Sequence, residues 1–215
     1  MKIKAFMKVA ICCLSLLSIM MCRKTTNTEE YFERFFQASS PFADEEMIMS
    51  TISYMDSIIS KEGNKKIESI FYDKARLLFL LRQYDEALEE LFKTDDEYYD
   101  IYKATLLICL GRESEAVSFL QKTIKLNEKG IMELKKQKEN KNIRAAIESY
   151  TLGLMACYIL ADMSYESILY ELTSQNIATR QEAEALFQEG FLFISDTQEI
   201  KEMFLKSTWS AKEDL

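Results

Sequence analysis

The sequence contains one pattern twice, as KARLLFLLRQYDEALEELFK at residues 74–93 and as KATLLICLGRESEAVSFLQK at residues 103–122. Identical residues recur at a constant offset of 29, and in the first copy they are Lys74, Ala75, Leu77, Leu78, Leu81, Glu86, Ala87, Leu91 and Lys93. A fixed internal period of this size, built from helix-forming residues, indicates stacked helical repeats. Each copy therefore predicts an apolar helix, a tight turn and a second helix that begins with Glu-Ala.

Small residues recur at matching places in the two predicted helices of each copy. Ala75 and Ala104 fall in the first helices, and Ala87 and Ala116 fall in the second. Because alanine projects only a methyl group, it lets the axes of two packed helices approach closely. We therefore expect these four side chains to be buried between paired helices.

The segment Arg82-Gln-Tyr-Asp-Glu-Ala-Leu88 resembles the turn of a tetratricopeptide repeat. That family's repeat is about 34 residues long, opens on a Trp and closes with a Pro. The two copies here have a period of 29 and lack that Trp and Pro. The resemblance implies a right-handed solenoid of antiparallel helix pairs, clearest at 66–93 and 95–127, of a kind that usually serves as a binding scaffold.

The composition predicts an all-α chain. Five Gly, one Pro and two Val in 215 residues leave few helix breakers and little strand-forming material. We expect a single tetratricopeptide-like repeat domain over residues 29–215, with capping helices at its ends. The expected helices lie near 28–38, 45–60, 66–81, 85–93, 97–110, 114–127 and 143–161, with two more between 179 and 207.

Residues 1–21 have the pattern of a targeting signal, with a basic start and an uncharged, mostly apolar run from Val9 to Met21. That run is shorter than the roughly 20 residues that span a bilayer. Cys22 stands where the signal of a bacterial lipoprotein places its acylated cysteine, although that family prefers a small residue at the position of Met21. We expect a lipid anchor at Cys22, a tether over 22–28 and a periplasm-facing location in the bacterial cell envelope. Plain secretion and an uncleaved anchor are the alternatives.

Charge is unevenly distributed along the chain. Loss of residues 1–21 removes three lysines and changes the net charge from −8 to −11, which disfavours nucleic acids and anionic membranes as partners. Residues 85–100 hold eight acids and one lysine, whereas residues 122–144 hold eight basic residues and three acids. Each segment is either a solvated helix face or a surface that steers a charged partner.

The residues for common catalytic chemistry are missing. The chain has no histidine, which removes the commonest general base and most zinc ligand sets. It has no phosphate-binding Gly-rich motif, and the acids at 95–100 lack the spacing and Gly of a calcium-binding loop. We therefore expect no enzyme activity, no metal and no cofactor. Cys109 and Cys157 lie in apolar runs and are expected to be buried thiols, with a disulfide between them as the alternative.

The tetratricopeptide register implies a concave wall formed by the first helix of each pair. The predicted partner-contacting residues on this wall are Tyr72, Arg76, Phe79, Tyr98, Ile101, Thr105, Tyr150, Leu154 and Tyr158. Tyr and Arg suit such a role because they combine large contact area with polar tips. Packing inside the array is the alternative for each. The same two roles are open to the aromatic stripe at Tyr31, Phe32, Phe35 and Phe36.

The sequence thus favours a non-enzymatic envelope lipoprotein whose helical repeats bind a protein or peptide. Two other functions fit the same features. One is an immunity-type lipoprotein that neutralises a toxin, for which the acidic segment 85–100 argues. The other is an accessory lipoprotein of an envelope assembly or of carbohydrate uptake, although carbohydrate binding normally uses several exposed aromatics including Trp, and the chain has one Trp.

Overall fold

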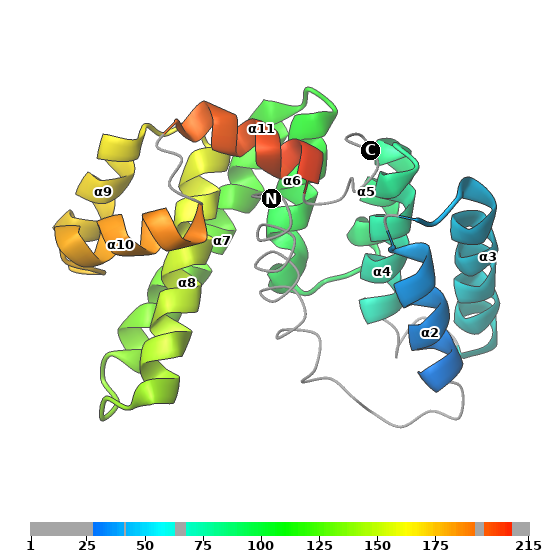
Figure 1. Cartoon of the computed structure of the whole chain (residues 1–215), viewed down its shortest axis with the longest axis horizontal. Helices are drawn as coiled ribbons and strands as arrows, with labels where there is room; N and C mark the ends of the chain where they lie inside the picture. Colours follow the sequence, from blue (N-terminus) through cyan, green and yellow to red (C-terminus); the bar gives the residue numbers. More distant parts are fainter. Residues whose placement is uncertain (1–27, 41, 63–67, 192–195, 208–215) are drawn as a thin grey trace. The chain divides into compact units, whose positions relative to one another are not determined.

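The computed structural model describes residues 28–40, 42–62, 68–191 and 196–207. All regular structure in these residues is helical and no strand occurs among them (Figure 1). The prediction of an all-α chain is confirmed. The chain forms two compact units that divide between Asp96 and Glu97, so the two copies of the repeat fall in different units.

The described residues of unit 1 form four helices: α2 (Thr28–Ala38), α3 (Glu45–Glu62), α4 (Glu68–Leu80) and α5 (Tyr84–Phe92). Each helix packs against the next one along the chain. The core contains apolar side chains from all four helices, among them Phe35, Ile48, Met55, Leu77 and Leu91. The α4–α5 pair is the first copy of the repeat.

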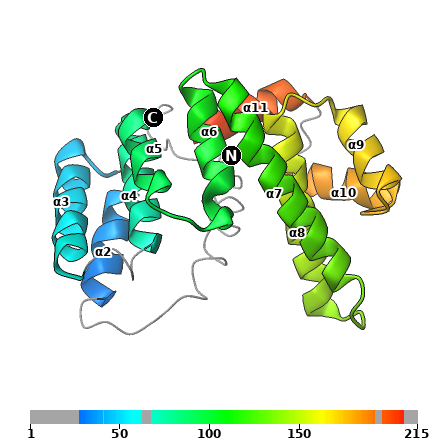
Figure 2. The same ribbon diagram turned by 180° about the vertical axis from the view of Figure 1, so that it is seen from behind.

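Unit 2 begins with a short 3-10 helix, η3 (Glu97–Tyr99), followed by α6 (Asp100–Cys109), α7 (Glu113–Leu134), α8 (Lys141–Leu160), α9 (Tyr165–Ser174), α10 (Arg180–Gly190) and α11 (Thr197–Ser207). Helix α7 packs against α6 on one side and against α8 on the other, while α10 packs against α8 and α9. The core forms around Leu154, Met155, Ile159, Leu169 and Phe187. Figure 2 shows α7 in front of α8, on the side of this unit opposite α10.

The four repeat alanines are buried, with exposed fractions of 0 to 1% at Ala75, Ala87, Ala104 and Ala116. They lie on the helices that pack as α4 with α5 and α6 with α7. The burial predicted from the 29-residue period is therefore confirmed, and each copy forms the expected pair of helices.

Helices α4, α6 and α8 end in the same way. The second residue after each helix adopts a left-handed conformation, at Arg82 (φ 59°), Gly111 (φ 69°) and Asp162 (φ 60°). In each case the next amide donates to a carbonyl five residues earlier, which is the bond of a Schellman cap; these bonds are Gln83 N to Leu78 O (3.0 Å), Arg112 N to Leu107 O (2.7 Å) and Met163 N to Tyr158 O (3.0 Å). Helix α9 has the same cap, at Asn176 (φ 53°) with a bond from Ile177 N to Leu172 O (2.9 Å), so the cap does not distinguish the first helix of a pair from the second.

Helix α7 continues to Leu134, beyond the end expected near residue 127. Gly130 does not break it. A Cβ at Gly130 would lie 2.9 Å from Cζ of Tyr150 on α8, so glycine is needed for the tyrosine ring to pack against the α7 backbone. The predicted helix over 97–110 also differs, because its first turn is the 3-10 helix η3.

Helices α10 and α11 each begin at a side-chain cap. Thr179 and Glu182 form a capping box at the start of α10. The carboxylate of Asp196 accepts hydrogen bonds from the amides of Gln198 (2.9 Å) and Glu199 (3.4 Å) at the start of α11. These side chains satisfy amides that have no partner inside the helix.

One described helix, α8, is long and apolar enough to cross a membrane by length and composition alone. Its carboxyl half contributes Leu154, Met155 and Ile159 to the core of unit 2, and its first turns carry Lys141 and Arg144. We therefore describe α8 as a core helix.

Candidate binding surface

An aromatic cluster joins α2 to α4 in unit 1. The hydroxyl of Tyr31 on α2 donates to the carboxylate of Asp73 on α4. One helical turn further along α2, the Phe35 ring stacks on Tyr31, and the Arg76 guanidinium lies 5.1 Å from the centroid of the Phe35 ring. Arg76 also lies 5.8 Å from the ring of Tyr72. Two side chains of α2 thus contact two side chains of α4, which holds the helices side by side.

Part of this cluster is open to solvent. Phe36 is 69% exposed and its ring lies 6.4 Å from that of the half-buried Phe32. Tyr72 and Arg76 are also half-buried. We call Phe32, Phe36, Tyr72 and Arg76 the aromatic surface. The stripe predicted on α2 is divided: Tyr31 and Phe35 are buried and pack inside unit 1, whereas Phe36 is exposed, and its partner-binding role stays a prediction.

The carboxyl group of Asp73 is the titratable group of this cluster. Burial raises its pKa from 3.8 to about 6, because the charged form is poorly solvated there. The hydroxyl of Tyr31 and the positive charge of Arg76 oppose that rise. The contact between α2 and α4 therefore contains a carboxyl group that changes its charge near pH 6.

A second cluster surrounds the lysines of the first repeat copy. The Lys74 ammonium contacts Asp56 Oδ1 at 2.7 Å and Glu90 Oε1 at 2.8 Å, and the Lys93 ammonium contacts the same Glu90 oxygen at 2.7 Å. Lys93 also lies 5.8 Å from the ring of Phe71. Glu90 and Phe71 are both buried.

The second copy places its acid and its aromatic ring in exchanged positions. Lys103, which corresponds to Lys74, contacts Asp100 at 3.2 Å and lies 5.9 Å from the ring of Phe119. Lys122, which corresponds to Lys93, lies 5.3 Å from the same ring. Asp100 stands at the position of Phe71, and Phe119 at that of Glu90, with the offset of 29 in both cases. At these paired positions each copy gives its lysines one carboxylate and one ring, and Asp56 on α3 adds a second carboxylate in the first copy.

This exchange was missed from the sequence because only identical residues were compared between the copies. The pairs Phe71 with Asp100 and Glu90 with Phe119 are visible at the same offset, and a comparison of chemical types at paired positions would have found them. The cluster stabilises the helix pair and has no arrangement suited to a reaction.

The nine residues predicted for the concave wall differ widely in accessibility. Phe79, Thr105, Leu154 and Tyr158 are between 0 and 5% exposed, so they pack inside their units. Tyr72, Arg76 and Ile101 are half-buried, whereas Tyr98 (41%) and Tyr150 (37%) are exposed. The nine are divided between the two units, so a single wall through all of them stays a prediction. Tyr72 and Arg76 are the two that the structure brings into one cluster.

The remaining chemical groups give no sign of a reactive site. Cys109 and Cys157 are free thiols; Cys157 is buried as expected, whereas Cys109 is half-buried. Desolvation raises their pKa values to about 11 for Cys109 and about 12 for Cys157. Among the described residues no group of three or more His, Cys, Asp or Glu side chains could hold a metal. A polar recess of about 250 Å³ lies beside Lys135 in unit 2, but the Lys135 ammonium donates to the carbonyls of Asn176 and Ile177 and so closes the turn after α9.

Searches against family models, curated proteins and solved structures find no match for this chain. Cys22, the signal segment and Trp209 lie outside the described residues. The function is therefore inferred from the surfaces and charges of the two units.

Proposed function

We propose that the chain is a non-enzymatic cell-envelope lipoprotein, anchored through Cys22, whose tetratricopeptide-like helical repeats bind a protein or peptide partner. The right-handed array is part of this proposal. The paired helices of each copy and the four buried alanines support it.

The aromatic surface is the observation that carries the proposed binding role. Phe36 exposes 69% of a large apolar side chain, and its ring lies 6.3 Å from that of Phe35, which Arg76 contacts. Arg76 and its neighbour Tyr72 are of residue types that often dominate binding energy. The surface is also held in place before a partner arrives, because Tyr31 and Phe35 fasten α2 to α4. Preorganisation of this kind lowers the entropy lost on binding.

An immunity-type function is the second candidate, because the acidic segment is largely exposed. Asp85, Glu86, Glu89, Asp95 and Glu97 all lie at the surface. A cluster of exposed carboxylates speeds association with a basic partner and disfavours acidic ones. A toxin with a basic surface would be such a partner.

Capture from solubilised membranes, followed by mass spectrometry, tests the binding role. The wild-type chain is compared with Phe36→Ala and Arg76→Ala, and with Val117→Ala as a control, since Val117 is 47% exposed on α7 in the other unit. Loss of an anchor at the aromatic surface should weaken binding by about 2 kcal/mol or more, roughly 30-fold. Thermal unfolding should change little for Phe36→Ala because its side chain is exposed. Equal capture by all four proteins would rule out this surface as the binding site.

A further inference from the structure

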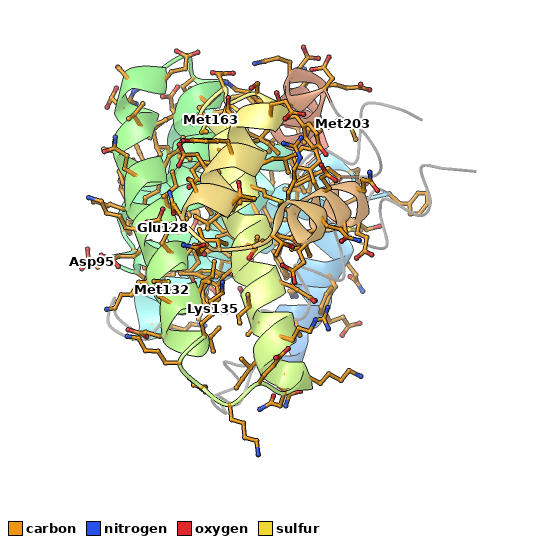
Figure 3. The ribbon with its side chains drawn as sticks, turned by 90° about the vertical axis from the view of Figure 1, so that its left-hand side faces the viewer. Asp95, Glu128, Met132, Lys135, Met163 and Met203 are labelled. Carbon is orange, nitrogen blue, oxygen red and sulfur yellow. The ribbon has the colours of Figure 1, made fainter. Side chains whose placement is uncertain are left out.

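One face of α7 carries a basic stripe that no other described helix covers. Lys122, Lys125 and Lys129 follow one another on α7 at the spacing of a single helix face, and Met132 lies on the same face one turn further on. Lys136 lies in the turn just after the helix, which ends at Leu134. All five side chains are exposed, and Met132 is 53% exposed. At 1.5 Å per residue the helical part of the stripe, from Lys122 to Met132, is about 15 Å long. Figure 3 labels Met132 and Lys135 towards the lower end of α7.

The position of the stripe follows from the packing of α7. This helix uses one side against α6 and another against α8, and its buried residues are Ala116, Leu120, Thr123 and Ile131. The remaining face points to solvent, opposite α10 (Figure 2). Within residues 117–136, Glu133 is the only exposed acid on α7. Within the part of the chain that the structure describes, Lys125, Lys129 and Lys136 form no ion pair, so the stripe keeps its positive charge.

We infer that the basic stripe of α7 binds the anionic headgroups of a phospholipid membrane. The inference rests on the proposed lipid anchor at Cys22. Residues 22–28 can span at most about 24 Å when fully extended, so an acylated Cys22 would keep the chain beside a membrane surface. Lysines held near an anionic membrane surface are attracted to it, and each lysine strengthens the partitioning of the protein onto the membrane by about fivefold.

The net charge of the mature chain disfavours an anionic surface, so this binding depends on the local positive charge of the stripe. Six of the acids lie at residues 85–96 and belong to unit 1, whereas α7 belongs to unit 2. Electrostatic interactions in salt decay over about 8 to 10 Å, so the lysines of the stripe interact mainly with charges that lie close to them. An exposed methionine among lysines also suits an interface, since its flexible apolar side chain can enter the headgroup region. This contact with the headgroups, in addition to the acyl chain at Cys22, would orient unit 2 on the membrane.

Vesicle binding tests the inference with a chain that carries no lipid, residues 22–215 with Cys22→Ser. Vesicles of phosphatidylglycerol mixed with phosphatidylcholine are compared with phosphatidylcholine alone, at low and high salt. The stripe variant combines Lys125→Gln, Lys129→Gln and Lys136→Gln. The matched control combines Gln37→Glu, Gln181→Glu and Gln188→Glu, which are exposed and change the net charge by the same amount. Circular dichroism verifies that all three chains have the same helical content.

The wild-type chain and the control should bind the anionic vesicles, and salt should weaken that binding. The stripe variant should bind about 100-fold more weakly. Equal binding by the stripe variant and the wild type, or no preference of the wild type for anionic lipid, would overturn the inference. So would a wild type that forms salt-sensitive oligomers through the stripe without binding vesicles, since the occupant would then be a second copy of the chain. The assay omits the acyl chain and any protein partner. A negative result would therefore not count against the proposed anchor or the proposed partner binding, which are tested separately.

Discussion

The carboxyl group of Asp73 makes the stability of unit 1 depend on pH. Its pKa is about 6 in the folded chain and about 3.9 when unfolded. A raised folded pKa means that protonation favours the folded state. The contribution is therefore fully present below about pH 4 and is lost as the pH rises through 6. A difference of about 2 pKa units corresponds to roughly 3 kcal/mol of unfolding free energy.

The substitution Asp73→Asn removes this ionisation and keeps an oxygen that can accept the hydrogen bond from Tyr31. Between pH 4 and pH 8 the wild type should lose on the order of 3 kcal/mol of unfolding free energy through Asp73, and the variant should not. The stability of the variant minus that of the wild type should therefore be about 3 kcal/mol larger at pH 8 than at pH 4. Urea unfolding followed by circular dichroism across this range measures the difference. Asp95→Asn is the control, because Asp95 is exposed in the same unit. A difference between Asp73→Asn and wild type that does not change with pH would refute the reasoning.

Further predictions concern the caps, the exchanged cluster and the anchor. Arg82 and Gly111 both have positive φ, which glycine adopts more easily than other residues. Arg82→Gly should therefore stabilise the chain by about 0.5 to 1 kcal/mol, and Gly111→Ala should destabilise it by about 1 kcal/mol. Shifts of the thermal unfolding temperature in the opposite directions would contradict this. Phe71→Asp and Glu90→Phe should each lower the unfolding free energy by about 3 kcal/mol or more. The double variant, which copies the second repeat, should lose about 1 to 3 kcal/mol less than the sum of the two single losses. Additive losses in urea unfolding would mean that the two positions are not coupled. Metabolic labelling with a fatty-acid analogue should mark the wild type and not Cys22→Ala, and equal labelling would eliminate the anchor.

The 29-residue period was enough to predict the helix pairs and the buried alanines. Helix pairing depends on local apolar periodicity and on small residues at the contact, and both are visible in one chain. The end of α7 was predicted less well, because a glycine usually weakens a helix. At Gly130 the missing Cβ instead makes room for Tyr150, and that contact involves a residue 20 positions away. Periodicity within one helix contains no information about such a neighbour.

The aromatic surface was predicted in part. Tyr72 and Arg76 were selected from the repeat register, and the aromatic residues of α2 were noted separately. Their association depends on the packing of α2 beside α4 and on the bond between Tyr31 and Asp73, which link residues 42 positions apart. The burial of Phe79, Leu154 and Tyr158 also follows from tertiary packing, since a helix face at the right spacing can point either to a groove or to the core.

Crosslinking in living cells tests the proposed binding function most directly. A photoreactive amino acid is placed at Phe36, which is 69% exposed on the aromatic surface, and in a second strain at Val117, which is 47% exposed on α7. After irradiation, we expect one discrete crosslinked protein from position 36 and none of that product from position 117. Addition of Arg76→Ala should abolish the crosslink at position 36. No crosslinked protein at position 36, or the same products from both positions, would contradict the claim that this surface binds a specific partner.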